Sequence, residues 1–266
     1  MQAFRNQIAI VLKHIISFLL RTVPRKYLQL FSHWVLKVVS IFYIGNKVEC
    51  PVCNAHFRKF LPYGRQSREN ALCPNCLALE RHRLMYLFLK NKTNFFTDKL
   101  KVLHVAPEIC FIEAFEKLHK DDYITADIES PLAKVKMDIH QVPFDNNTFD
   151  VAFCNHVMEH VDSDLKAMSE LHRVLKPGGW AIIQVPFFYP LEEKTVEDIT
   201  ITDPKERYRR FGQDDHVRKY GKDYAERLAS AGFTVDANDY VKELPDEVVT
   251  RYALPKDETI FFCKKA

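Results

Sequence analysis

The chain has 266 residues, of which 47% are hydrophobic and 27% are charged. These fractions exclude a globally disordered or collagen-like chain, and the length allows one large domain with an accessory module. The net charge of +3 is unevenly distributed, because residues 1–48 carry seven Lys or Arg residues and no acidic residue. Residues 49–266 are therefore acidic overall, with a net charge of −4.

Residues 1–48 are predicted to form a basic helical arm with two apolar runs, at 8–20 and 31–44. Both runs are interrupted by polar residues and are shorter than the ~20 apolar residues that a transmembrane helix needs. In the second run, polar residues recur every three or four positions, which predicts an amphipathic helix that ends near Gly45. Two interpretations stay open: the arm lies on an anionic membrane surface, or it packs on the rest of the chain or on a second copy.

Residues 49–90 are predicted to form a zinc-binding module with a linking helix from about residue 79 to 90. Two C-x-x-C pairs separated by 19 residues are typical of a tetrahedral zinc site. Four thiolate ligands leave no position for water, so the metal would be structural. Redox pairs or disulfides are the alternatives, and His56 or His82 is the candidate to replace one cysteine. The expected zinc ligands are Cys50, Cys53, Cys73 and Cys76.

The cysteine pattern also bears on the compartment. The other three cysteines, Cys110, Cys154 and Cys263, lie in apolar surroundings typical of buried thiols. No small-residue cleavage site follows Leu20, so the first apolar run does not resemble a secretory signal. We therefore expect a cytoplasmic protein, either free or attached peripherally to the inner face of the membrane through residues 1–48. The apolar arm is also compatible with a homodimer.

In residues 91–266, short apolar runs alternate with helical stretches. Strands are predicted at 101–106, 123–127, 149–155 and 180–185, helices at 111–119, 163–175 and 222–231, and a turn at 177–179. This alternation predicts a Rossmann-like α/β fold, with a parallel sheet covered by helices on both faces. Runs 233–235 and 259–263 would add an antiparallel edge. The polar insertion at 187–221 is interpreted as a substrate lid.

Three motifs carry a more specific resemblance: VPFDNNTFDV at 142–151, NHVMEH at 155–160 and LHRVLKPGGW at 171–180. With these motifs, residues 99–266 resemble the class I S-adenosylmethionine-dependent methyltransferases of the small-molecule and lipid-modifying type. The chain departs from that family after the first strand, where HVAPE at 104–108 replaces the usual glycine-rich loop. HVAPE behind a CP-x-C, CP-x-C, ERHR module resembles a narrower group of these enzymes.

The resemblance implies where the cofactor would bind. Asp127, at the end of the second strand, would accept hydrogen bonds from the ribose hydroxyls, although a turn or helix cap is its alternative role. Asp138 would face the adenine amino group. Ala106 is small enough for a close backbone approach, and Glu108 would meet the amino group of the methionine part. The full set of expected cofactor contacts is His104, Ala106, Glu108, Asp127, Asp138, Ile139 and Asn155.

The methyl-transfer chemistry is expected at the residues that follow the fourth strand. Methyl transfer from a sulfonium depends largely on positioning, and a base is needed only when the acceptor is protonated. His156 is the expected base or acceptor contact because imidazole titrates near neutrality. Glu159 would take part by orienting this loop, and a divalent metal held by His156, Glu159 and His160 is an alternative.

The insertion at 187–221 supplies a third candidate catalytic residue, His216. It lies in a polar run that also contains Arg218 and Tyr220. These side chains would bind an acceptor with negative charge. The alternative is that they pair with neighbouring acidic residues such as Asp215 and Glu206.

The predicted function is methyl transfer from S-adenosylmethionine to a small-molecule, glycan or lipid-linked acceptor, with Zn²⁺ as a structural metal. RNA methylation is one alternative, because basic residues and a zinc module precede the domain. The acidic charge of residues 49–266 and the lack of an aromatic stacking motif disfavour a nucleic-acid partner. A non-catalytic scaffold is the other alternative, because the first loop lacks glycine.

Overall fold

The computed structural model describes residues 36–64 and 67–266, so the apolar run 8–20 and most of the predicted arm lie outside the described residues. Residues 36–40 are helical, followed by the 3-10 helix η1 (Ile41–Tyr43) and by β1 (Ile44–Glu49). The helical residues end at Tyr43, close to the predicted end near Gly45, and β1 then pairs antiparallel with β2 (His56–Phe57). Residues 44–48 thus begin the cysteine module. Among the described helices, none combines the length and apolar character needed to span a bilayer.

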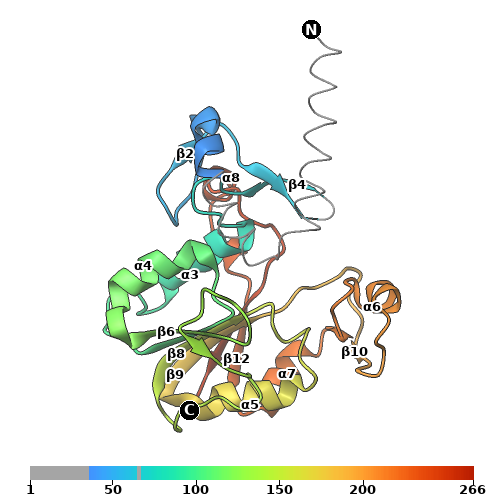
Figure 1. Cartoon of the computed structure of the whole chain (residues 1–266). Coiled ribbons are helices and arrows are strands. Elements are labelled where there is room, and N and C mark those ends of the chain that lie inside the picture. Colours follow the sequence, from blue (N-terminus) through green and yellow to red (C-terminus); the bar gives the residue numbers. More distant parts are fainter. Residues whose placement is uncertain (1–35, 65–66) are drawn as a thin grey trace.

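The cysteine module consists of two antiparallel hairpins and the helix that follows them. The first pairs β1 with β2, and the second pairs β3 (Leu61–Tyr63) with β4 (Arg68–Leu72). A tight loop containing a C-x-x-C pair follows β1 and another follows β4. Helix α3 (Glu80–Lys92) then leads down to the large sheet, and Figure 1 shows the module stacked above it.

A seven-stranded sheet forms the centre of the molecule. It contains β5 (Val102–Val105), β6 (Tyr123–Asp127), β7 (Val135–Lys136), β8 (Phe149–Asn155), β9 (Leu175–Gln184), β12 (Thr234–Asn238) and β13 (Ile260–Lys264). The strand order is β12-β13-β9-β8-β5-β6-β7. The pairs from β7 to β9 are parallel, and β13 pairs antiparallel with both β9 and β12. The predicted parallel sheet with an antiparallel edge is confirmed.

Two apolar cores cover the two faces of this sheet. One joins α3 and α4 (Ile109–His119) to the sheet and includes Phe57 and Phe60 of the cysteine module. The other joins α5 (Asp164–Val174) and α7 (Tyr224–Ser230) to the opposite face. The strands are buried on both faces because helices cover both, which explains their continuous apolar runs. The module shares its core with the sheet and is not an isolated unit.

The insertion 187–221 has secondary structure of its own. It contains β10 (Val196–Glu197), α6 (Pro204–Phe211) and β11 (Arg218–Lys219), and β10 pairs with β11. Asp203 caps the start of helix α6, where its side chain accepts hydrogen bonds from two backbone N–H groups. Gly212, in the left-handed conformation, caps its end. Figure 1 shows α6 and β10 standing beside the main sheet.

Two further features differ from the prediction. The predicted turn at 177–179 lies inside β9, where Gly178 and Gly179 pair with the backbone of Lys265 across a bulge. The segment before β13 forms the 3-10 helix η3 (Tyr240–Glu243) and α8 (Asp246–Arg251). Arg251 of α8 binds Glu49 with an N–O distance of 3.1 Å, so α8 lies against the cysteine module (Figure 1).

Arg83 of α3 joins the module to the segment after α8. Its side chain is fully buried and lies over the ring of Phe60 at 4.3 Å. A buried guanidinium requires hydrogen-bond acceptors around it. Five backbone carbonyls within 3.1 Å supply them: those of Asn70, Ala71, Ala78, Tyr252 and Ala253.

Candidate active site

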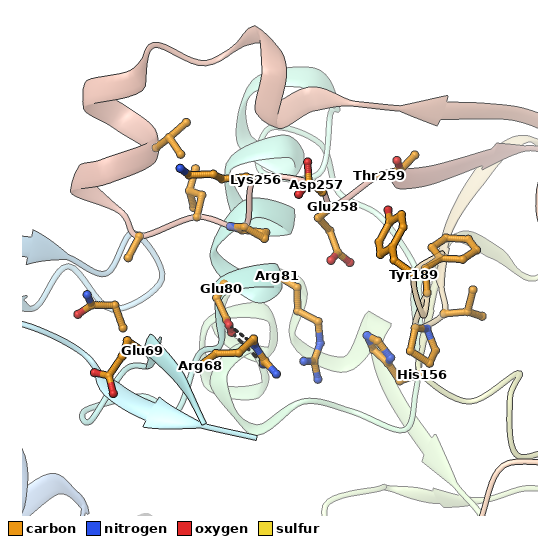
Figure 2. A pocket seen from close by; sticks show the side chains of 18 of the residues that line it. Arg68, Glu69, Glu80, Arg81, His156, Tyr189, Lys256, Asp257, Glu258 and Thr259 are labelled. Atoms are coloured by element: carbon orange, nitrogen blue, oxygen red, sulfur yellow. Dashed lines mark hydrogen bonds and ion pairs between the residues drawn. The ribbon is translucent and has the colours of Figure 1, made fainter. Parts of the chain in front are cut away.

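A cleft of about 670 Å³ opens where β8 and β9 end. Figure 2 shows Arg81 from α3, His156 from the end of β8 and Glu258 from the loop before β13 around this cleft. Apolar side chains complete part of its wall: Val185, Pro186, Phe187 and Leu254. The cleft lies beside the point where the strand order reverses between β5 and β8, which is where open α/β sheets bind their ligands. Its volume and mixed lining suit a small molecule.

His156 is held at the edge of this cleft in an uncommon backbone conformation. Its φ angle is +55°, and its N–H donates to the carbonyl of Gln184 at 2.8 Å. Its Nδ1 lies 3.5 Å from Oε1 of Glu159, while its buried Nε2 has no hydrogen-bond partner among the described residues. A left-handed conformation at a residue other than glycine costs on the order of 1 kcal/mol and is concentrated at functional sites.

The loop after β5 contains no glycine, but its backbone adopts a conformation that glycine favours. Ala106 has a φ angle of +50°, in the region that favours glycine, and its N–H donates to the carbonyl of Ala126 at 2.9 Å. The methyl side chain is the smallest that still carries a Cβ atom, so the strain of this conformation is limited. The loop therefore has a glycine-like backbone conformation at Ala106, while its close approach to a cofactor stays a prediction.

Glu108 forms the centre of a buried hydrogen-bond chain. Its Oε2 lies 2.5 Å from Nε2 of His104, whose Nδ1 contacts the hydroxyl of Tyr123 at 2.6 Å. Its Oε1 accepts a hydrogen bond from Nδ2 of Asn155 at 2.9 Å. Burial alone would raise the pKa of Glu108, but the positive charge and hydrogen bond of His104 lower it to about 2. His104 has no exposed surface, so it cannot touch a bound ligand directly. Its role is to position Glu108 through their hydrogen bond.

The other residues expected to contact the cofactor are spread along the neighbouring strand ends. Asp127 ends β6, where its Oδ1 accepts hydrogen bonds from the N–H groups of Glu129 and Ser130, both at 2.7 Å. Asp138 is exposed and binds the Nδ1 of His140 at 2.8 Å. Ile139 is buried in the core beneath this loop. Their contacts with a cofactor stay a prediction.

Four buried polar atoms beside the cleft lack a hydrogen-bond partner among the described residues. They are Nε of Arg81, Nε2 of His82, Oδ1 of Asn155 and Nε2 of His156. All four side chains line a small cavity that adjoins Glu258 and Glu108. Buried polar groups are rarely left unpaired, and such a concentration indicates a place for a polar ligand. The small cavity measures about 10 Å³, which is room for one water molecule, so a larger polar ligand would reach these atoms from the adjoining cleft.

The sequence analysis did not identify Arg81 and Glu258 as site residues, and it considered His82 only as a zinc ligand. His82 instead accepts a hydrogen bond from the N–H of Leu79 at 3.2 Å and lies 3.9 Å from Oε1 of Glu108. Burial lowers the pKa of His82 to about 3 and raises that of Glu258. The run of polar residues at 80–83 was the available signal for Arg81 and His82, whereas Glu258 lies in an ordinary polar loop.

The insertion is anchored by the residues that were expected to bind an acceptor. The guanidinium of Arg218 is buried and donates hydrogen bonds to the carbonyls of Met158 and Val161, both at 2.5 Å. The hydroxyl of Tyr220 donates to Asp164 at 2.9 Å. Both side chains are buried, so neither is accessible to an acceptor, and their hydrogen bonds fasten the insertion to the loop after β8 and to α5. Arg218 pairs with Glu197, at 3.1 Å, and not with the acids considered from the sequence.

The four cysteines of the two C-x-x-C pairs come together as one cluster. The sulfur atoms of Cys50 and Cys76 are 3.6 Å apart, and those of Cys53 and Cys73 are 3.8 Å apart. These distances are far longer than a disulfide bond, and all four sulfur atoms lie within 4.8 Å of one another. A tetrahedral zinc ion with bonds of about 2.3 Å would separate its sulfur ligands by about 3.8 Å. The cluster therefore fits such an ion.

Both loops of the cluster have the same hydrogen-bond pattern. The N–H of Asn54 donates to the carbonyl of Cys50 at 2.8 Å, and the N–H of Leu77 donates to that of Cys73 at 3.0 Å. Asn54 and Leu77 also share a positive φ angle, 56° and 65°. The two loops are thus a matched pair of turns that present their sulfur atoms to a common centre.

Comparisons with known proteins found similarities to methyltransferases over parts of this chain. Residues 102–183 match the family described as a methyltransferase domain. A 2-phytyl-1,4-naphtoquinone methyltransferase of Nostoc punctiforme is 42% identical over 52 residues, which are 20% of this chain and 23% of that protein. A sterol 4-C-methyltransferase of Caenorhabditis elegans is 41% identical over 49 residues, which are 18% of this chain and 15% of that protein. The chain thus matches less than a quarter of the length of either relative.

Among the solved structures that this chain partly resembles is a SAM-dependent methyltransferase from Aquifex aeolicus. The two chains are 18% identical and superpose with a TM-score of 0.39. The superposition covers 67% of this chain and 86% of that one.

Proposed function

We propose that this chain, of which residues 102–183 match a methyltransferase domain, transfers a methyl group from S-adenosylmethionine to a small-molecule acceptor. The observation that carries the proposal is the group of four unpaired buried polar atoms, which adjoins a cleft of about 670 Å³ at the strand-order reversal. In this proposal the cofactor and the acceptor would bind next to each other, as direct transfer between two bound molecules requires.

The cofactor would be held by residues at the ends of β5, β6 and β8. Ala106 offers a close backbone approach, Glu108 and Asn155 offer polar groups beside the small cavity, and Asp127 lies where ribose hydroxyls would bind. Asp138 would face the adenine. When bound, the cofactor supplies a methyl group on a positively charged sulfur atom, and the ionised Glu108 suits such a charge.

The acceptor would lie in the cleft with its polar group towards His156. Glu159 orients His156, whose unpaired Nε2 can take a proton from an acceptor hydroxyl. Glu258 is a second candidate base, because burial raises its pKa and so makes the carboxylate more basic. The apolar wall would hold the body of the acceptor. The names of the two relatives, which refer to a naphthoquinone and a sterol, support an acceptor with a large apolar part.

We further propose that the cysteine cluster binds a structural Zn²⁺ ion. Its four sulfur atoms would complete the tetrahedral coordination, so the ion would have no open position for chemistry. Its role would be to fix the two turns and, through Arg83, the position of α3 with Arg81 and His82. This places the metal outside the reaction but makes the shape of the cleft depend on it.

Calorimetric titration of the zinc-loaded protein with S-adenosylmethionine and S-adenosylhomocysteine tests the cofactor assignment. An Asp127→Asn variant keeps an oxygen that can accept the two backbone hydrogen bonds, but it loses the negative charge. We expect it to bind both compounds about tenfold or more weakly than the wild type, because hydrogen bonds to a charged group contribute about 1.5–3 kcal/mol.

Asp121→Ala is the matched control, because Asp121 is exposed in η2 (Lys120–Asp122), at the opposite end of β6, and should leave binding unchanged. Equal weakening by both variants would contradict the role of Asp127. Absence of binding to a folded wild type would overturn the proposed function and favour the scaffold alternative.

A further inference from the structure

A second group of metal-ligating side chains lies next to His156, on the side of its Nδ1 atom. Glu159 and His160 belong to the loop after β8, and His216 belongs to the insertion, just before β11. One ligand atom from each of these residues lies within 4.8 Å of the other two. This set differs from the one considered from the sequence, in which His156 took the place of His216. Nε2 of His160 is 3.9 Å from Oε1 of Glu159, and the two imidazole ring centres are 4.8 Å apart.

The hydrogen-bond surroundings of both histidines are those of metal ligands. Nδ1 of His216 contacts the carbonyl of Phe211 at 3.3 Å, which requires a proton on Nδ1 and leaves a lone pair on Nε2. Nδ1 of His160 faces Asp215, with its carbonyl at 3.4 Å and its Oδ2 at 3.6 Å. Histidines that bind metals commonly donate their other N–H to a carbonyl or carboxylate in this way.

Two buried atoms of the cluster have no hydrogen-bond partner among the described residues. They are Oε2 of Glu159 and Nε2 of His216, and the two residues are only 2% and 0% exposed. A carboxylate oxygen and an imidazole lone pair are both electron donors, so they cannot satisfy each other without a proton or a cation between them. Burying them side by side is costly unless something positive is bound there.

We propose that Glu159, His160 and His216 bind one divalent transition-metal ion. Two imidazoles and one carboxylate suit Mn²⁺, Fe²⁺, Co²⁺ or Zn²⁺, whereas Mg²⁺ and Ca²⁺ prefer oxygen ligands. Two ligand atoms that each lie about 2.1 Å from an ion are at most about 4.2 Å apart, so small side-chain rotations would close the site. Three protein ligands leave at least one position for water or for an oxygen of another molecule.

The ion would join the insertion to the loop that carries His156. The backbone already links them, because the N–H of Val217 donates to the carbonyl of Glu159 at 3.0 Å. Glu159 would bind the ion with one oxygen and keep its contact with Nδ1 of His156 through the other. The ion binding stands independently of methyl transfer, while its effect on His156 rests on the proposed function.

Mn²⁺ titration of the protein with zinc already in the cysteine cluster tests the proposal, because Mn²⁺ disfavours thiolates. Electron paramagnetic resonance of free Mn²⁺ should show one ion bound per chain, and the ion should raise the Tm. A His216→Asn variant should bind Mn²⁺ about a hundredfold more weakly. An Asp215→Asn variant, which changes only a neighbour of His160, should bind about tenfold more weakly.

His172→Asn is the matched control, because His172 lies in the last turn of α5 away from the cluster, and it should bind Mn²⁺ as the wild type does. Co²⁺ provides a second measurement on the wild type, in which visible absorption bands without sulfur charge-transfer bands are expected. If the wild type binds no second ion, or if His216→Asn binds it as tightly as His172→Asn, the proposal is wrong. Because the readout is metal binding, this failure would leave the cofactor titration unaffected.

Discussion

The cysteine cluster and the Glu159–His216 cluster, defined as Glu159, His160 and His216, are built differently. The ligand atoms of each lie within 4.8 Å of one another. The cysteines come in two pairs, and each pair is shaped by one short turn with its own backbone hydrogen bonds. In the Glu159–His216 cluster, one histidine comes from the insertion and must be delivered by the packing of that whole segment.

This difference predicts different consequences of losing a ligand. The cysteine cluster lies at the junction of the module with α3 and shares a core with the sheet, so its loss should spread through the fold. The insertion has anchors besides His216, namely the buried Arg218 and Tyr220, which both donate hydrogen bonds to the carbonyl of Met158 in the loop after β8. Loss of a ligand there should change metal binding and leave the fold in place.

Removing one cysteine ligand should have the largest effect. We expect Cys50→Ala to lose its zinc and to be destabilised by on the order of 5 kcal/mol or more, because zinc binding supplies folding free energy to small modules. Zinc content and thermal unfolding measure this. Cys263→Ala, at a buried cysteine outside the cluster, should keep its zinc and lose about 1 kcal/mol. A Cys50→Ala protein with normal zinc content would end the assignment of Cys50 as a ligand.

Arg83→Met tests whether the module and the cleft are coupled. The substitution leaves five backbone carbonyls around an apolar side chain, and we expect a loss of about 3 kcal/mol in the free energy of unfolding. Chemical denaturation of the zinc-loaded protein measures it. Arg81→Met, two residues earlier and at the cleft, should change stability by less than about 1 kcal/mol while impairing methyl transfer. Equal destabilisation of the two variants would contradict the separation of their roles.

The smallest expected effect concerns the pH dependence of stability. Burial lowers the pKa of His82 from 6.5 to about 3, so the folded protein holds it neutral while the unfolded chain protonates it. Its contribution to stability is therefore present above pH 6.5 and is lost as the pH falls towards 3.

Between pH 6.5 and about pH 5.5, the wild type should lose about 1 kcal/mol more stability than His82→Gln. Urea denaturation at the two pH values provides the comparison, with the exposed His56→Gln as a control that should lose as much as the wild type. Equal losses of stability in the wild type and His82→Gln would show that the pKa of His82 is the same in the folded and unfolded states.

The sequence by itself determined the features that depend on neighbouring residues. The apolar runs predicted the strands of the sheet, because strands covered on both faces must be continuously apolar. The spacing within each C-x-x-C pair predicted the cysteine cluster, because each pair needs only one short turn. The position of Gly178 and Gly179 was mispredicted, since glycine is typical of turns but here lies in a strand.

Only the tertiary structure decided which distant residues meet. Arg81, His156 and Glu258 come from three elements whose approach depends on how α3 and the segment after α8 pack over the sheet. His216 meets Glu159 because buried hydrogen bonds of Arg218 fix the insertion in place. Such contacts leave no periodic pattern in the sequence, because they depend on the sum of many packing interactions, whereas strands and tight turns are set by the residues within them.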